Sequence, residues 1–372
     1  MSARPRAIFT GGGEFHLELR RLAAEVLTPA RVRRGRRLAI LKTALIMGWA
    51  LCSYLGLLLF ARSVWTVAPL ALSLALALSG IGFAIAHDAN HGALLAGRKR
   101  NRILGLSFDL IGASSYIWRA KHNQSHHSYT NIVGGDADID QLPLLRLAPD
   151  QTRRGLHRFQ HLYAWPIYGL FALRYHLFGD VKELVRGRVG EITPLAPPRG
   201  LQLVLFVGGK AVFWSWALVI PLLVAPWWAV LVTFACCSWV LGFTTATVFQ
   251  LAHSVDQVSF SSLERMRGGP KPVWAVHQVE TTVDFATHNR LLGWYLGGLN
   301  FQIEHHLFPG VCHVHYPHLL EAVRETCARH GVRHVAQPSL WAALASHARW
   351  LRQMGRGEPG LGAGAGEAVA VS

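Results

Sequence analysis

The sequence predicts an all-α integral membrane protein, in which four transmembrane helices form two hairpins and a cytoplasmic helical cap holds a histidine-rich site for two metals. Three observations predict this class. Hydrophobic residues make up 51% of the 372 residues, and charged residues only 16%. The apolar residues gather in four long runs that hold very few of the basic residues. Several of the 20 histidines stand in short groups at or beyond the ends of these runs.

Each of the four apolar runs is long enough to cross a bilayer, which takes about 20 apolar residues in a helix. Lys42 and Lys210 lie near the ends of two runs, where we expect their side chains to extend to the lipid headgroups. The alternative, a soluble bundle of buried helices, rarely contains apolar runs of this length. The short connections between the first two and the last two runs predict two hairpins. The runs cover residues 38–60, 64–86, 202–224 and 226–250.

The basic residues predict how these helices are oriented. Of the 37 Lys and Arg residues, nine precede the first run, 15 lie between residues 87 and 201, and ten follow residue 250. An excess of Lys and Arg marks the cytoplasmic side of a membrane protein. We therefore expect the N-terminus, the middle segment and the C-terminal third on the cytoplasmic side. No cleavable signal is expected, because the arginine-rich start lacks a short apolar core with a cleavage site.

The formal net charge of +16 has two interpretations. Nucleic-acid binding is not predicted, because no basic stripe with interleaved aromatic residues stands apart from the membrane segments. Attraction to anionic lipid explains the charge more simply. Arg98, Lys99, Arg100 and Arg102 could bind the phosphates of a coenzyme A or carrier-protein arm, or could only anchor the chain at the membrane. Arginine outnumbers lysine strongly, which favours a GC-rich bacterial source and hence a bacterial inner membrane.

Three regions are expected along the chain. Residues 1–37 form a basic arm, residues 38–350 form the membrane domain, and residues 351–372 form a flexible tail rich in Gly and Ala. Within the middle segment, the apolar stretches 103–118 and 162–178 are expected to lie on the membrane surface. The five cysteines form no CxxC pair, so neither a disulfide framework nor a thiolate metal site is predicted.

The first histidine groups follow the second apolar run. His87 and His91 are four residues apart, so on a helix they project from one face and can bind one metal. In the segment His122-Asn-Gln-Ser-His126-His127, the first two histidines again share a face. His127 points about 100° away on a helix and could reach a second metal.

The remaining groups follow the fourth run. His253 stands just beyond its end, and the segment Gln302-Ile-Glu-His305-His306 repeats the earlier spacing with Gln in the first place. An even number of spans separates these groups from the first ones, so all eight imidazoles are expected on one side of the membrane. They suffice for two metals. Imidazole binds Zn, Cu, Fe and Ni alike, but a site built only from histidines favours oxygen chemistry, since a structural zinc needs only four ligands.

An acidic run, Asp136, Asp138 and Asp140, resembles the start of a calcium-binding loop. Position six of that loop would be Gln141 in place of Gly, and position twelve would be Leu147 in place of Glu, so calcium is not predicted. We expect the run to cap a helix or to orient the second histidine group. A separate set of histidines just after the last group could orient metal ligands in the same way: His313, His315 and His318.

Four motifs together resemble the membrane fatty-acid desaturases. They are HDANH (87–91), HNQSHHSYTN (122–131), FQLAH (249–253) and GGLNFQIEHHLFP (297–309). The resemblance covers roughly residues 40–350. Gln302 is similar to the glutamine of the front-end and related acyl-lipid branch. The HPGG haem motif of a fused cytochrome b5 domain does not occur in the sequence.

The resemblance implies an O2-dependent enzyme with a non-haem di-iron centre, which introduces a cis double bond into a long acyl chain. The acyl group could be carried by coenzyme A, a carrier protein or a glycerolipid. Electrons would come from a separate ferredoxin or cytochrome b5-like carrier. Trp118 or Trp294 could line the acyl tunnel. Residues that would support the ligands are Asp88, Asn90 and Asn300, with Gln302 near the iron. The implied iron ligands are His87, His91, His122, His126, His127, His253, His305 and His306.

Two other functions remain as alternatives. A related membrane di-iron oxygenase, such as an acyl hydroxylase, an acetylenase or a carotenoid ketolase or hydroxylase, would share the histidine groups. A metal transporter would bind cations through histidine as well. Transport sites place ionisable residues within the spans, and none is expected at mid-depth here, so the oxygenase class is favoured.

Overall fold

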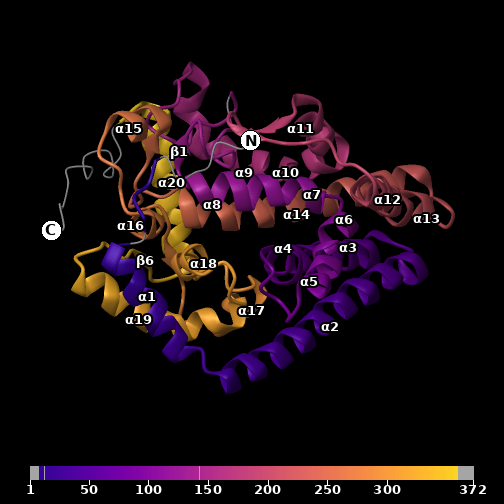
Figure 1. Ribbon diagram of the computed structural model, residues 1–372. Helices are drawn as coiled ribbons and strands as arrows, with labels where there is room; N and C mark the ends of the chain where they lie inside the picture. Colours follow the sequence, from indigo (N-terminus) through magenta and orange to yellow (C-terminus); the bar gives the residue numbers. More distant parts are fainter. Residues whose placement is uncertain (1–7, 12, 142, 359–372) are drawn as a thin grey trace.

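The computed structural model describes residues 8–11, 13–141 and 143–358, and it is mostly helical (Figure 1). Most of the predicted tail, residues 359–372, lies outside the described residues. Four helices are long and apolar enough to cross a membrane, which confirms the predicted number of spans. Their pairing into two membrane hairpins and the side on which the rest of the chain lies stay predictions. The four helices are Pro29–Phe60, Val64–His91, Leu201–Leu222 and Trp227–His253.

The first half of the described chain alternates long and short helices. In order they are α1 (Gly13–Val26), α2 (Pro29–Phe60), α3 (Val64–Gly80), η2 (Ile81–Ala86), α4 (His87–His91), α5 (Arg98–Gly105), α6 (Ser107–Leu110), α7 (Ser115–Trp118), η3 (Arg119–His126), α8 (His127–Tyr129), η4 (Gly155–Phe159), α9 (Gln160–Tyr168), α10 (Leu170–Arg174), η5 (Tyr175–Gly179) and α11 (Asp180–Arg186).

The second half contains two membrane helices and a region of shorter ones. In order they are α12 (Leu201–Trp214), η6 (Ser215–Val219), α13 (Ile220–Leu222), α14 (Trp227–His253), α15 (Leu263–Gly268), α16 (Trp274–Glu280), α17 (Arg290–Tyr295), α18 (Gln302–Leu307), η7 (His313–His315), α19 (Tyr316–Arg329) and α20 (Leu340–Arg356).

Three pairs of short strands tie loops together. Strand β1 (Ile132–Val133) runs parallel to β4 (Ser261–Ser262), with Ile132 opposite Ser261. Strand β2 (Arg188–Val189) is antiparallel to β3 (Thr193–Pro194), and β5 (Asp284–Phe285) is parallel to β6 (Ala336–Gln337). The first and third pairs join segments more than 50 residues apart in the sequence. They therefore hold together the loops that lie around the histidine groups.

Helix α2 begins nine residues before the apolar run that was predicted as a span. Thr28 caps it, because its side chain accepts a hydrogen bond from the backbone N–H of Arg31, and Pro29 suits the first turn, where no backbone donor is needed. Residues 29–37 of the predicted basic arm therefore form the first turns of α2, and the domain boundary at residue 37 stays a prediction. Likewise α20 continues past the predicted end of the membrane domain at residue 350, to Arg356.

The second and fourth membrane helices both end at a histidine. Helix α3 continues through the π-helical turn η2 into α4, so that one continuous helix ends at His91. Gly92 stops it with a left-handed backbone, φ 79°. Helix α14 ends at His253, which is therefore the last residue of the helix. The sequence had suggested that His253 would lie just beyond the helix end.

Two of the other membrane helices pack on α3. This helix contacts both α2 and α14, and α14 also contacts α9 and α10 (Figure 1). The approach of α10 to α14 is close enough to require glycine, since a Cβ on Gly242 would lie 2.5 Å from the backbone oxygen of Gly169. Helix α12 packs mainly on α6 and leaves most of its apolar surface exposed.

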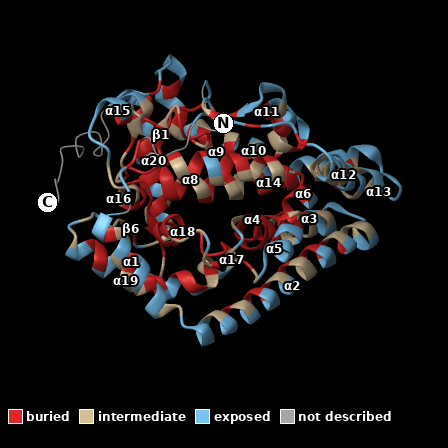
Figure 2. Cartoon of the chain, viewed as in Figure 1, coloured by how far each residue is buried: buried red, intermediate tan, exposed pale blue. Residues whose placement is uncertain are grey.

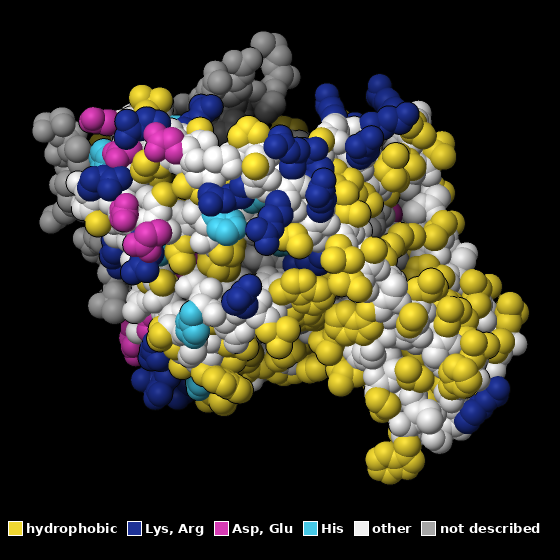
Figure 3. Space-filling model, turned by 90° about the horizontal axis from the view of Figure 1, so that it is seen from below, with side chains coloured by type: hydrophobic (Ala, Val, Ile, Leu, Met, Phe, Trp, Pro, Cys, Tyr) yellow, Lys and Arg dark blue, Asp and Glu magenta, His cyan; other side chains and the backbone are white. Residues whose placement is uncertain are grey.

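Apolar and charged side chains are segregated on the surface. Seen from below, hydrophobic side chains cover the right-hand part, where α2, α12 and α13 lie, and most charged side chains lie to the left (Figure 3). Such a large exposed apolar surface is what lipid contact requires, whereas soluble monomers rarely expose patches beyond a few hundred Å². The chain is therefore a membrane protein. Figure 2 shows that its most buried region lies where α4, α8 and α18 meet.

The two lysines in the apolar runs do not extend to headgroups, which corrects the expectation from the sequence. Lys42 is only 5% exposed, and its Nζ lies 2.8 Å from Nε2 of His313. Lys210 forms an ion pair with Asp180 at 2.6 Å and donates a hydrogen bond to the backbone oxygen of Gly112. Both ammonium groups have polar partners inside the protein. Such partners are needed because an unpaired charge in a low-dielectric interior is costly.

Candidate metal centre

Eight imidazoles from five elements converge in the buried region between the membrane helices and the C-terminal helices. Helix α4 supplies two of them, η3 two, α8 one, the end of α14 one and α18 two. All but His91 are buried, and His305 and His306 are fully so. The eight are the ones that the sequence predicted: His87, His91, His122, His126, His127, His253, His305 and His306.

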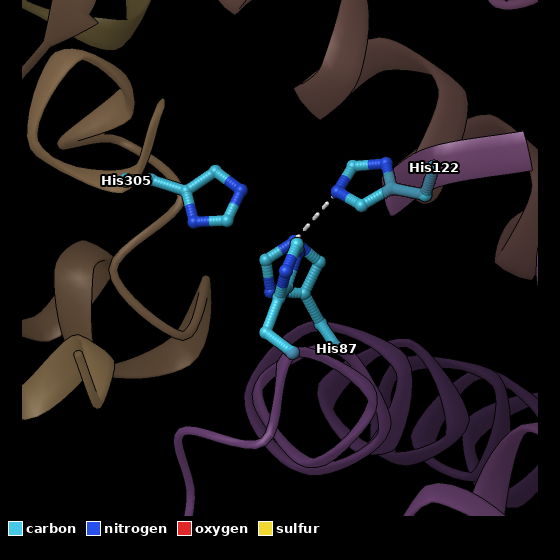
Figure 4. A group of neighbouring side chains, drawn as sticks. His87, His122 and His305 are labelled. Atoms are coloured by element: carbon cyan, nitrogen blue, oxygen red, sulfur yellow. Dashed lines mark hydrogen bonds between the residues drawn. The ribbon is translucent and has the colours of Figure 1, made fainter. Parts of the chain in front are cut away.

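The first group joins the first two histidine motifs to the last one. Its ligand atoms lie within 4.8 Å of one another and belong to His87, His91, His122 and His305. Figure 4 shows the rings of His87, His122 and His305 turned toward a common space from three different segments. The Nε2 atoms of His87 and His122 are 3.2 Å apart. A single cation in that space could contact all of them.

The second group consists of His126, His253 and His306, with ligand atoms again within 4.8 Å. His127 contacts both groups: its Nε2 is 3.2 Å from that of His122 and 3.0 Å from that of His305, and its ring stacks on that of His306 with centroids 4.3 Å apart. The sequence had placed His122 and His126 on one face for one metal. The structure keeps these two rings together, stacked with centroids 5.2 Å apart, and their ligand atoms lie within 4.8 Å of one another. His126 also joins His253 and His306, so the π-helix η3 contributes to both groups.

The nitrogen atoms of this cluster fit metal ions better than they fit one another. Several ring nitrogens are buried without any hydrogen-bond partner, among them Nε2 of His91, His126 and His306. Others face a second Nε2 at about the length of a hydrogen bond, and two such atoms need a shared proton or a cation between them. Buried polar atoms are otherwise paired in native proteins. The donor set of imidazole nitrogens suits Zn, Cu, Fe or Ni.

Electrostatics favours the neutral imidazoles that bind metals. Burial and the neighbouring rings lower the pKa well below 6.5 for four histidines outside the membrane helices: His122, His127, His305 and His306. His126 differs. Burial lowers its pKa too, but the carboxylates of Asp136 and Asp138 together raise the pKa above the ordinary value. A metal ligand must be deprotonated at the binding nitrogen, so a carboxylate on the other nitrogen makes His126 a more basic donor.

A carboxylate holds the ring of His126. Asp136 Oδ2 lies 3.0 Å from Nδ1 of His126, and Asp136 also accepts hydrogen bonds from the backbone N–H groups of Asn131 and Asp138. With Nδ1–H donated to the carboxylate, Nε2 is left free to face the second group. The acidic run therefore does orient the second histidine motif, one of the two roles expected for it.

Two further partners were missed by the sequence analysis. Gln278 Oε1 lies 2.7 Å from Nδ1 of His306, and the hydroxyl of Tyr316 lies 3.1 Å from Nδ1 of His305. Both leave Nε2 of the histidine pointing toward the cluster. Nothing in the local sequence around Gln278 marks it. Tyr316 stands close to the predicted His313 and His315, which was the one available signal.

The chain is similar in sequence to proteins of known family. The model of the family described as "Fatty acid desaturase" matches residues 63–338. The chain belongs to the fatty acid desaturase family. Its relatives include an sn-1 linoleoyl-lipid 6-desaturase of Synechocystis sp., 36% identical over 85% of this chain and 88% of the relative. A protein of the same name from Arthrospira platensis is 34% identical, over 90% of this chain and 89% of the relative. An acyl-lipid (8-3)-desaturase of Physcomitrium patens is 37% identical over 85% of this chain and 66% of the relative. The chain is therefore an oxidoreductase that desaturates fatty-acyl groups.

In this desaturase, the predicted supporting residues differ in what they contact. Asp88 Oδ1 lies 3.5 Å from Nδ1 of His87, as expected of a residue that orients a ligand. Asn90 is bound elsewhere: it donates to the backbone oxygens of Ala86 and Gly105 and so fastens α4 to the end of α5. Among the described residues, the side chain of Asn300 forms one hydrogen bond, to the backbone oxygen of Ala286 at 3.5 Å.

Gln302 of the desaturase lies against the second group. Its side-chain amide nitrogen is 2.9 Å from Nε2 of His253, and its Oε1 is buried without a partner. The glutamine thus contacts a candidate ligand directly. Helix α18 places it one turn from His305 and His306, so the three side chains reach the cluster from one short helix.

The two tryptophans named for the acyl tunnel have different surroundings. Trp118 stacks on His122, with ring centroids 4.3 Å apart and an interplanar angle of 24°, and it touches the rings of His87 and His91 edge-on. It forms an aromatic wall of the first group. Trp294 lies instead under the ammonium of Lys42, 5.3 Å from its ring centre.

Proposed function

We propose that the desaturase binds two iron ions in the imidazole cluster. His87, His91, His122 and His305 would hold one iron, and His126, His253 and His306 the other, with His127 between them. The observation that carries this proposal is the convergence of eight imidazoles, seven of them buried, several of whose ring nitrogens have no hydrogen-bond partner among the described residues. Asp88, Asp136, Gln278 and Tyr316 would orient the rings from behind, as outer hydrogen-bond partners do in metal sites. Gln302 would position His253.

The reaction needs a metal because no side chain can take a proton from an unactivated methylene group. Bound iron would supply the activation of O2 and the removal of hydrogen. In the overall balance, O2 accepts two hydrogen atoms from adjacent methylenes, together with two electrons and two protons from outside, and leaves as two waters. The chain's own residues fix the ligand nitrogens and exclude bulk water, since seven of the eight imidazoles are buried. Trp118 offers an apolar surface beside the first group.

The substrate that we propose is a linoleoyl group of a membrane glycerolipid, desaturated at position 6 with cis geometry. Two relatives that span most of the chain carry this activity in their names. An acyl chain within a bilayer could approach between the apolar membrane helices without leaving the lipid. Coenzyme A and carrier-protein esters are the competing forms of substrate.

We further propose that a separate ferredoxin or cytochrome b5-like protein supplies the electrons, at the cytoplasmic face of a bacterial inner membrane. The distribution of Lys and Arg supports this orientation. The same distribution would attract an acidic carrier, since complementary charge speeds protein association.

The test is the fatty-acid profile of a host that expresses the chain, is fed linoleate and contains a compatible ferredoxin and its reductase. Gas chromatography with mass spectrometry would locate any new double bond. The variant that combines His305→Ala with His306→Ala is the control. A new double bond at position 6 in the active strain alone supports the proposal. A hydroxylated acid, or a double bond elsewhere, would contradict the proposed reaction or its position.

A further inference from the structure

A small hollow, partly open to solvent, lies between the helices that follow the second membrane helix and the first turns of α12. We call it the arginine hollow. Arg102 of α5 and Arg119 of η3 line it, together with Tyr116 of α7 and with Gln202 and Phe206 of α12. It therefore combines two cations with aromatic and apolar surface.

The position of the arginine hollow in the chain sets its depth in the membrane. Arg102 follows the second candidate span by eleven residues, and Gln202 is the second residue of the third. The described residues between these two helices contain no further candidate span, so both helix ends lie at the same face of the bilayer. Ile103 and Leu201, which adjoin the hollow in sequence, are 60% and 72% exposed. The hollow is thus placed where lipid headgroups meet acyl chains.

The charges of the arginine hollow are not balanced. Among the described residues no carboxylate forms an ion pair with Arg102 or Arg119, and the hydrogen bond of Arg119 goes to the amide oxygen of Asn90 at 2.8 Å. Burial lowers the pKa of Arg119, and the charge of Arg102 adds to this effect, as expected of two cations held close together. The one acidic group in the lining is Asp109, which is only 8% exposed. Two guanidiniums and one carboxylate leave a formal charge of +1.

Residues that line the arginine hollow adjoin residues that contact the imidazole cluster. Arg119 lines the hollow, while its neighbour Trp118 stacks on His122. Asn90, which accepts the hydrogen bond from Arg119, lies one residue before His91. A ligand in the hollow would thus be held close to the first metal-binding group.

We propose that the arginine hollow binds the phosphate diester of the glycerophospholipid whose acyl chain is desaturated. Guanidinium groups bind phosphate with paired, charge-assisted hydrogen bonds, and basic pockets at the cytoplasmic ends of membrane helices bind lipid headgroups. This inference rests on the proposed function, because desaturation at position 6 acts near the carboxyl end of the acyl chain. The glycerol and its phosphate must then lie close to the metals, which is where the hollow is.

The test measures lipid retention, which needs no turnover. The purified iron-loaded protein would be mixed with equal amounts of dipalmitoyl phosphatidylglycerol and the phosphate-free dipalmitoyl monogalactosyldiacylglycerol, and native mass spectrometry would count the lipids that stay bound. We expect about a tenfold preference for the phospholipid, as one charge-assisted contact would give. Arg102→Gln should remove most of this preference. Arg100→Gln, which removes the same charge from the same helix outside the hollow, should leave it unchanged.

Three results would overturn the inference. The first is equal retention of both lipids by the unaltered protein. The second is an equal loss of the phospholipid preference in Arg102→Gln and Arg100→Gln. The third is that palmitoyl-coenzyme A, at a lower concentration than the phospholipid, displaces it from the unaltered protein but not from Arg102→Gln. The last result would assign the hollow to the phosphates of coenzyme A. Arg102→Lys guards against misfolding of the Gln variant, since it keeps the charge and should keep part of the preference. Should the host make no new unsaturated acid while retention still depends on Arg102, the proposed function fails and the hollow remains a phospholipid site.

Discussion

The ammonium nitrogen of Lys42, inside the first membrane helix, lies 2.8 Å from Nε2 of His313, which is 271 residues away in the chain. The other ring nitrogen of His313 lies 2.7 Å from Oδ2 of Asp88, and Oδ1 of Asp88 lies 3.5 Å from Nδ1 of His87. These contacts form a continuous chain from a membrane helix to a candidate iron ligand. Asp88, Cys312 and His313 could themselves hold a cation, but the ammonium of Lys42 already supplies a positive charge beside them.

This chain predicts the effect of Lys42→Met. Without the ammonium, His313 and Asp88 lose the partner that fixes them, and His87 loses orientation. We expect desaturase activity to fall up to about 10-fold, the lower end of the cost of removing an outer partner of a metal ligand, because Lys42 acts on His87 through His313 and Asp88. Product formation and iron content per chain would be measured together. Lys271→Met, at an exposed position, is the control, and full activity in Lys42→Met would show that the chain of contacts has no role.

Asp136→Ala should weaken the second group of imidazoles. The carboxylate holds Nδ1 of His126 at 3.0 Å, and its loss should lower iron affinity about 10- to 100-fold. Competition with a graded series of chelators would measure this. Asp140→Ala removes an exposed carboxylate from the same loop and should change little. If both variants lose iron equally, the loop acts through its charge and not through His126.

Removal of metal should destabilise the protein. A ligand that binds only the folded state raises the free energy of unfolding with the logarithm of the ratio of its concentration to its dissociation constant. At a metal concentration a thousand times the dissociation constant, the gain is about 4 kcal/mol. Thermal unfolding in detergent would be followed with and without a chelator. The variant with both His305→Ala and His306→Ala should show a much smaller shift. An identical shift in that variant would mean that the chelator acts elsewhere.

Gly242→Ala should impair the packing of α14 on α10. The new methyl group would lie 2.5 Å from the backbone oxygen of Gly169, and neither helix backbone can move cheaply. We expect a loss of about 1–3 kcal/mol, the usual cost of overpacking, measured as a lower unfolding temperature. Gly48→Ala is the matched control, because a Cβ there has no neighbour within 4 Å. Equal stability of both variants would contradict the close approach of the two helices.

Stability should fall as the pH is lowered from about 7 to about 4. His347 is fully buried; its Nδ1 lies 2.6 Å from the backbone oxygen of Ser254, and its Nε2 lies 2.7 Å from the hydroxyl of Tyr168. A neutral ring satisfies both contacts, and burial lowers its pKa from 6.5 to about 4.

The unfolded histidine therefore gains its proton at a higher pH than the folded one. The stabilisation is complete above pH 6.5 and is lost as the pH falls toward 4, by about 1.4 kcal/mol per unit. Unfolding temperatures of the unaltered protein and of His347→Gln across this range would test it. The variant should show a shallower dependence on pH, and parallel curves would rule out His347 as a cause.

The sequence was sufficient for the features that depend on local patterns. Apolar runs longer than any soluble core helix needs indicated the four membrane helices, because hydrocarbon requires such runs. The spacing of the histidines indicated that His87 and His91 would share a face, because an α-helix repeats about every 3.6 residues. Both features survive in the structure, although α2 and α20 extend past the expected boundaries, where capping residues and not hydropathy set the helix ends.

Only the tertiary structure decided which histidines belong together and what holds them. Through the π-helix η3, His122 joins His87, His91 and His305 while His126 joins His253 and His306. A turn type that depends on the surrounding packing cannot be read from spacing. The partnership of Gln278 with His306, and that of Lys42 with His313, join residues 28 and 271 positions apart. Contacts of this kind arise when separate helices pack against one another, and no periodic pattern within one segment records them.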